Sequence, residues 1–142
     1  QGYTDDPADV LIGVGASSIS RFPQGYAQNA PATSAYTAAI RDGRFSVARG
    51  HAFKGEDLMR SRMIEALMCD FRIDADEITG SFGIPKAELM ARLQAVAAEF
   101  DGLIKVTDAG LDIPVDARPL TRMIARAFDA YDLSKAGHSS AI

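Results

Sequence analysis

The residues best suited to ligand binding stand early in the chain, in a loop rich in glycine and serine. The stretch "DVLIGVGASSISRFPQGYAQN" runs from an apolar segment into Gly13 and Gly15. A phosphate site needs backbone N–H groups at a helix N-terminus, usually with a lysine nearby. The stretch has no third glycine at the required spacing and no Gly-Lys-Ser/Thr, and Pro23 excludes a helix through that point. The glycines predict a tight turn or a close backbone approach, and phosphate binding is disfavoured.

Other reactive side chains lack partners at the spacing that their chemistry requires. His51 and His138 are the only histidines, and neither has a second metal ligand nearby. We interpret both as surface or packing residues. Cys69 stands on an expected helix, where a buried, inert thiol is the usual interpretation. These residues predict no metal site.

The charges restrict the range of partners. Arg41, Arg44 and Arg49 are close in sequence and could bind carboxylates, although a solvated basic edge is the more common outcome. The net charge is −4 and the pI is about 5.1. This balance argues against a nucleic acid or an anionic membrane as partner.

Composition is that of a globular domain. The 142 residues are 47% hydrophobic and 24% charged, and their apolar runs are too short to span a bilayer. One cysteine allows no intramolecular disulfide and fits a reducing, cytoplasmic compartment. The chain begins at Gln1 without an initiator methionine, so we expect it to be a piece of a longer protein.

The pattern of apolar residues predicts an α+β chain that changes character near residue 55. Before that point we expect one strand at Val10–Val14, a short helix with Thr33 or Ser34 as its N-cap and Gly43 as its stop, and an extended segment over 44–53. After it, amphipathic spacing predicts helices over 56–71, 75–81, 85–100 and 118–131, with a hairpin around 108–110. The expected domains are therefore 1–54 and 55–142.

The second domain has the element order of a winged-helix module. If this module bound DNA, the helix over 85–100 would enter the groove. Its two basic residues are balanced by two acidic ones, whereas a DNA reader should be distinctly basic. A winged-helix binding module remains an alternative function, but DNA recognition is disfavoured.

Several strings, taken together, resemble the C-terminal third of oxygen-independent coproporphyrinogen III oxidases. The matching strings are "QGYT", "GVGASSISRFPQGYAQN", "AYTAAIRDGR", "ARGHAF", "MIEALMCDFRID" and "RPLTRMIARAFDAYD". The resemblance implies the end of a partial β/α barrel followed by a mainly helical, winged-helix-like domain. It also implies a parent enzyme, a radical S-adenosylmethionine oxidoreductase of haem (porphyrin) biosynthesis. In this family a 5′-deoxyadenosyl radical removes hydrogen from propionates of coproporphyrinogen III, and two decarboxylations give vinyl groups.

The resemblance also indicates what this chain lacks. The family binds a [4Fe-4S] cluster through three cysteines in a Cys-x₃-Cys-x₂-Cys motif, and Cys69 alone cannot hold one. We expect the cluster to lie in an upstream barrel of the same polypeptide, so this chain by itself should hold no cofactor and be inactive. A related radical enzyme or haem chaperone that shares this domain is a further alternative.

Site residues follow from the matched strings. Ile19 corresponds to an isoleucine that contacts S-adenosylmethionine, and Gly13 and Gly15 are expected to allow close backbone approach there. Arg21 and Arg49 are candidates to bind substrate propionates, because arginine binds carboxylates in a bidentate manner. No residue of this chain is expected to be catalytic or to bind metal. An exposed lone strand in 1–30 could let the chain self-associate.

Overall fold

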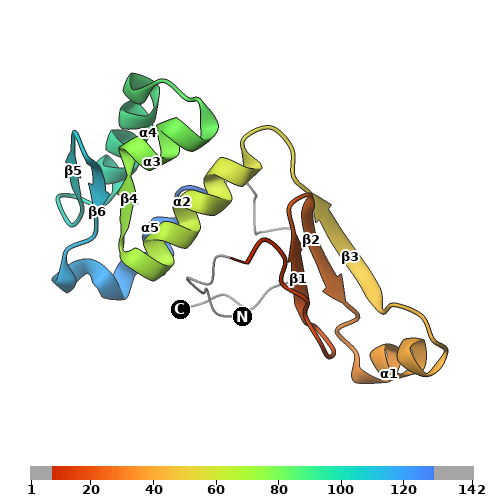
Figure 1. Cartoon of the computed structure of the whole chain (residues 1–142). Coiled ribbons are helices and arrows are strands. Elements are labelled where there is room, and N and C mark those ends of the chain that lie inside the picture. The colour runs from red at the N-terminus through yellow and green to blue at the C-terminus, as the bar shows by residue number, and fades with distance from the viewer. Residues whose placement is uncertain (1–7, 130–142) are drawn as a thin grey trace. The chain divides into compact units, whose positions relative to one another are not determined.

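The computed structural model describes residues 8–129, which form two compact units with the boundary between Leu58 and Met59 (Figure 1). Both units contain helices and a small antiparallel sheet, so the chain is α+β, as the sequence predicts. Within the described residues, no helix combines the length and apolar character needed to cross a bilayer.

The first unit is built on a three-stranded antiparallel sheet in the order β1–β2–β3. The strands are β1 (Ile19–Phe22), β2 (Gly25–Asn29) and β3 (Val47–Ala52), and helix α1 (Thr33–Arg41) connects the last two. Only Pro23 and Gln24 separate β1 from β2, so the two strands form a tight hairpin. The expected extended segment is confirmed as β3.

The strand predicted at Val10–Val14 is wrong. Only Leu11 is paired, through two backbone hydrogen bonds with Arg21 at the outer edge of β1. Gly15 and Ser17 both have positive φ, so the backbone bends before a ladder can extend. The region is not a lone strand, because β1 pairs with β2 and β2 also pairs with β3. Self-association of the chain stays a prediction.

Helix α1 confirms the predicted helix but not its predicted cap. Its N-cap is Ala32, and no side chain caps the helix, whereas the sequence suggested Thr33 or Ser34. The helix ends before Gly43, whose φ of +68° suits glycine.

The second unit has three helices, a three-stranded sheet and a terminal helical segment. The helices are α2 (Asp57–Asp70), α3 (Ala75–Phe82) and α4 (Lys86–Glu99), with the first two residues of α2 in the first unit. The strands are β4 (Arg72–Asp74), β5 (Lys105–Thr107) and β6 (Gly110–Asp112), arranged β4–β6–β5. The hairpin predicted around 108–110 is confirmed, whereas β4 was not predicted because three residues carry too short a pattern.

The core of this unit is formed largely by apolar residues of the predicted helices and hairpin, together with Ile73 of the unpredicted strand β4. Its most deeply buried large side chains are Met63, Leu67, Ile73, Ile78, Leu89, Leu93, Leu111 and Ile124. Leu58 and Met123, which the pattern assigned to apolar faces, are 45% and 61% exposed. Cys69 is half-buried and forms no disulfide, whereas the sequence predicted a buried thiol.

The last predicted helix, 118–131, begins differently from expectation. Residues Val115–Leu120 form a 3₁₀ helix, and the α-helix α5 covers only Thr121–Arg126. Pro119 lies inside the 3₁₀ segment, where its missing N–H and its ring disfavour an α-helix. Residues 130–142, with Tyr131, His138 and Ser140, lie outside the described residues.

Helix ends in this unit are fixed by specific contacts. The Asp74 side chain caps α3, accepting hydrogen bonds from the N–H groups of Asp76 and Glu77, both at 3.0 Å. Phe71, expected on α2, follows that helix with a left-handed φ of +60°. The Arg118 guanidinium lies 4.3 Å from the centre of the Phe71 ring, which stabilises this turn by a cation–π contact.

Candidate functional site

One face of the first sheet collects three of the candidate residues. Ile19 pairs with Gln28, which pairs with Arg49 on the other side. Arg21 likewise pairs with Tyr26, and Tyr26 with His51. Directly paired residues in an antiparallel sheet point to the same face, as do residues two apart along a strand. The shared face therefore carries Ile19, Arg21, Tyr26, Gln28, Arg49 and His51, and we call it the arginine face.

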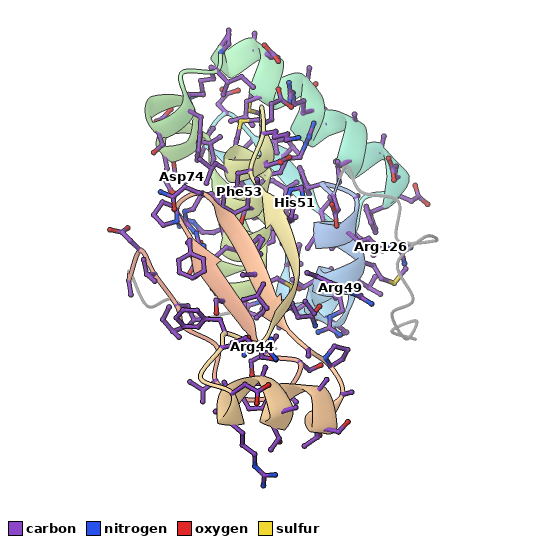
Figure 2. The ribbon with its side chains drawn as sticks, turned by 90° about the vertical axis from the view of Figure 1, so that its right-hand side faces the viewer. Arg44, Arg49, His51, Phe53, Asp74 and Arg126 are labelled. Carbon is purple, nitrogen blue, oxygen red and sulfur yellow. The ribbon has the colours of Figure 1, made fainter. Side chains whose placement is uncertain are left out.

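Gly25 allows the strands that carry this face to come together. A Cβ atom at this position would lie 2.0 Å from the carbonyl oxygen of His51, and the φ of Gly25 is +153°. Any larger residue would push β2 away from β3. Figure 2 shows Arg49 and His51 along β3, with Phe53 just beyond the strand.

The Gly13–Gly15 loop packs against the backbone that carries Ile19. A Cβ atom at Gly13 would lie 2.7 Å from the Ile19 carbonyl oxygen. The Gly13 N–H donates to the Ser20 hydroxyl and the Gly15 N–H to the Tyr36 hydroxyl, each at 3.1 Å. These N–H groups therefore have protein acceptors, which agrees with the sequence argument against a phosphate loop.

Asn29 ties the same loop to β2. Its side-chain N–H₂ group donates to the carbonyl oxygens of Gly13 and Gly15, at 3.2 and 3.0 Å. Gln28 donates to the Ser17 carbonyl at 3.2 Å. The loop is thus held by side chains of the strand next to β1, so it positions Ile19 from outside the sheet. Ile19 itself begins β1, whereas the sequence placed it in a loop.

The predicted arginine cluster is divided by the fold. Arg49 is exposed on the arginine face, and Arg21 is half-buried there. Arg44 instead forms an exposed ion pair with Asp42, with 3.0 Å between guanidinium nitrogen and carboxylate oxygen. Arg41 is the last residue of α1. Arg21, which lies outside the sequence cluster, is placed by the sheet on the same face as Arg49.

His51 has a specific partner that the sequence did not reveal. Its Nε2 lies 3.1 Å from Oδ2 of Asp57, the first residue of α2. The same oxygen accepts a 2.8 Å hydrogen bond from the Lys54 N–H. The Asp57 side chain is only 8% exposed, whereas that of His51 is 41% exposed. A histidine and an aspartate six positions apart are too common to signal such a pair.

The His51 end of the sheet is hollowed. A shallow cavity of about 460 Å³ is bordered there by Phe22, Tyr26, Gly50 and His51, among others. Tyr26 and Phe53 make an edge-to-face contact with ring centres 5.1 Å apart, which fixes the aromatic wall of this end.

The chain's donors do not fit an iron–sulfur cluster. Such clusters are held by several cysteine thiolates, and the sequence contains one cysteine. Across residues 8–129, no group of three histidine, cysteine or acidic side chains is arranged to hold a metal ion.

The second unit offers no basic surface on α4. Both basic residues of this helix form ion pairs, Lys86 with Asp76 at 2.8 Å and Arg92 with Glu88 at 2.6 Å. A DNA-reading helix should direct its positive charges at phosphates. The structure thus adds to the sequence argument against DNA binding.

Comparison with known proteins gives extensive matches. The chain is 62% identical over 142 residues to the oxygen-independent coproporphyrinogen III oxidase of Paracoccus denitrificans, covering 100% of this chain and 32% of that protein. It is 54% identical over 134 residues to the enzyme of the same name from Cereibacter sphaeroides, covering 94% and 30%. No family model matches the chain.

A solved structure is similar as well. Coproporphyrinogen III oxidase (HemN) from Escherichia coli, described as a radical SAM enzyme, superposes with a TM-score of 0.79 at 31% identity. The match covers 93% of this chain and 31% of that protein. The class of protein that the chain resembles is therefore that of the radical SAM enzymes.

The particular proteins that it resembles are oxygen-independent coproporphyrinogen III oxidases, so the resemblance seen in the motifs is confirmed. The chain spans about a third of the length of these relatives.

Proposed function

We propose that this chain is the C-terminal part of an oxygen-independent coproporphyrinogen III oxidase of porphyrin biosynthesis. The parent enzyme would decarboxylate two propionates of coproporphyrinogen III to vinyl groups, giving protoporphyrinogen IX. The observation that carries the proposal is the 62% identity over the full chain to an oxidase of that name. The single cysteine fits a reducing compartment such as the cytoplasm.

The two units would have different places in the parent. The first would end a partial β/α barrel and contribute to its binding site. The second would be a winged-helix-like domain, a proposal supported by the antiparallel β4–β6–β5 sheet and the order of α2, α3 and α4. The charge balance of α4 argues for a structural or covering role and not for DNA recognition.

The arginine face would be this chain's contribution to the active site. Ile19 is an aliphatic side chain among polar ones, and it would pack on the adenosine part of S-adenosylmethionine. Arg21 and Arg49 would bind propionates of the substrate, because a guanidinium matches a carboxylate in shape and charge. Gly13 and Gly15 would act by letting the loop approach the Ile19 backbone closely.

The rest of the chemistry would come from outside this chain. A [4Fe-4S] cluster and S-adenosylmethionine, held by the remaining part of the parent, would supply the one-electron chemistry. The residues described here would bind, orient and cover the substrate. The missing barrel of the same polypeptide is therefore the main partner that we propose for this chain.

The proposal is tested on the full-length parent protein, purified without oxygen and reconstituted with iron and sulfide. We expect it to convert coproporphyrinogen III to protoporphyrinogen IX in the presence of S-adenosylmethionine and a reductant. Product is measured by fluorescence after oxidation to the porphyrin. Cleavage of S-adenosylmethionine without loss of carbon dioxide from this substrate would instead favour a different radical enzyme.

A further inference from the structure

We infer that His51, held by Asp57, is a third carboxylate-binding residue on the arginine face. The inference deepens the proposed function and rests on it, because the ligand would be a propionate of the same substrate. Nε2 of His51 lies 3.1 Å from Oδ2 of Asp57, and the Asp57 side chain is 8% exposed.

The pair determines which ring nitrogen can meet a ligand. An ionised carboxylate only accepts hydrogen bonds, so contact with Asp57 places a proton on Nε2. Nδ1 is then the nitrogen through which the ring can bind a substrate group. When both nitrogens are protonated, the imidazolium donates to Asp57 and to a ligand carboxylate at once. This is the way in which an aspartate orients a histidine in other active sites.

The fold places His51 in register with polar side chains of the arginine face. His51 pairs with Tyr26, which pairs with Arg21, so the three side chains form one row across the sheet. Arg49 is two residues earlier on β3 and on the same face. Successive same-face residues are about 7 Å apart along a strand, which is close enough to contact one substituent from two residues. His51 also borders the cavity at this end of the sheet.

Asp57 is fixed independently of any ligand. Its Oδ2 accepts the Lys54 N–H at 2.8 Å, so the carboxylate is anchored to the turn that leads into α2. Asp57 would act as a positioning residue through His51. The competing explanation is that the pair only clamps this turn, and two substitutions distinguish the explanations.

The test uses His51→Gln and His51→Asn in the reconstituted full-length parent. A glutamine amide can occupy the place of Nε2 and keep the contact with Asp57, but it has no group at Nδ1. An asparagine amide can occupy the place of Nδ1 but does not reach Asp57. Arg44→Ala is the matched control, because Arg44 pairs with Asp42 away from the arginine face. Asp57→Asn tests the positioning role.

Binding is measured with coproporphyrin III, the stable oxidised form of the substrate, by fluorescence quenching. The tetramethyl ester of the same porphyrin serves as the ligand without carboxylates. We expect His51→Gln to weaken coproporphyrin binding by about tenfold and to leave ester binding unchanged, since one charge-assisted hydrogen bond is lost. His51→Asn and Asp57→Asn should lose less affinity for coproporphyrin III. In both variants KM for coproporphyrinogen III should rise while kcat is retained.

The measurements distinguish a carboxylate-binding role of His51 from a purely structural one. Coproporphyrin binding by His51→Gln at the wild-type level, with the same melting temperature, would overturn the inference and leave the pair as a clamp. Equal weakening for the porphyrin and its ester would also overturn it. If the wild-type parent binds the porphyrin through His51 but does not decarboxylate coproporphyrinogen III, the proposed function fails while the carboxylate site stands.

Discussion

Ile19 and Arg49 lie on the two outer strands of one sheet, each in register with Gln28 between them. Neighbouring strands are about 5 Å apart, so these two side chains emerge from the same face about 10 Å from each other. The proposed cofactor-binding residue and a proposed substrate-binding residue are thus held at a fixed separation by backbone hydrogen bonds. This relationship makes the roles of the face testable one residue at a time.

Replacing Ile19 by aspartate in the parent protein should weaken S-adenosylmethionine binding by at least about tenfold, because a charge would enter an apolar contact with adenosine. Ile19→Val, which keeps an apolar side chain, is the control and should bind nearly as the wild type does. Equilibrium dialysis of the cofactor provides the measurement. Equal affinity of the aspartate variant would remove Ile19 from the site.

Arg21→Lys and Arg49→Lys should each raise KM for coproporphyrinogen III several-fold, because lysine keeps the charge but loses bidentate geometry. Arg44→Lys is the control for a general change of charge type, since Arg44 pairs with Asp42. Steady-state kinetics of the reconstituted parent measure the effect. Unchanged kinetics in either variant would show that the arginine in question has a structural role.

Gly25→Ala should destabilise the first unit, because the new Cβ would lie 2.0 Å from the His51 carbonyl oxygen. The strands would have to separate, which also disturbs the arginine face. Gly80→Ala is the matched control: Gly80 lies within α3 with nothing within 4 Å, so alanine there should stabilise by about 0.5–1 kcal/mol. Thermal unfolding of both variants tests the contrast.

Leu93→Ala should destabilise the second unit by about 2–5 kcal/mol, because this fully buried side chain of α4 would leave a cavity in the core. Leu103→Ala is the comparison. Because Leu103 is 46% exposed, this substitution should lower the free energy of unfolding far less. Urea unfolding followed by circular dichroism gives both values. Equal losses would mean that the core is not formed as described.

The Asp74 cap should make the stability of α3 depend on pH. Hydrogen bonds from the N–H groups of Glu77 and Asp76, together with Arg72, lower the pKa of Asp74 below its usual value of 3.8. Because the pKa is lower in the folded state, the ionised carboxylate stabilises the fold at every pH above the usual pKa. This contribution is lost as the pH falls through the lowered pKa. The melting temperature, measured from neutral to strongly acidic pH, should fall more steeply for the wild type than for Asp74→Asn. Asparagine also caps helices but does not titrate. Parallel curves would contradict the prediction.

Iron and sulfide reconstitution of the 142-residue chain alone should give no cluster absorbance, because one cysteine cannot supply the thiolates of a [4Fe-4S] cluster. The full-length parent is the positive control. A stoichiometric cluster on the isolated chain would overturn the view that the cluster ligands lie elsewhere in the parent.

Much of the second unit could be predicted from sequence because its signals are local. The 3.6-residue spacing of Leu89, Leu93 and Val96 defines one helix face, and burial of that face confirms it. Asp74 before α3 and Gly83 after it are helix-end residues that act within one turn. The resemblance to the oxidases could also be predicted from the motifs, because it depends only on which residues follow one another in the sequence.

Only the tertiary structure decided how the first unit is arranged. The run Val10–Val14 looks like a strand, but strands depend on partners distant in sequence, and the hydrogen-bonded hairpin formed at Ile19–Asn29 instead. Likewise, nothing in the sequence joins Arg21 to Arg49 or His51 to Asp57. Those pairs depend on the register of three strands and on the turn into α2, and register is set by long-range backbone pairing that no local pattern encodes.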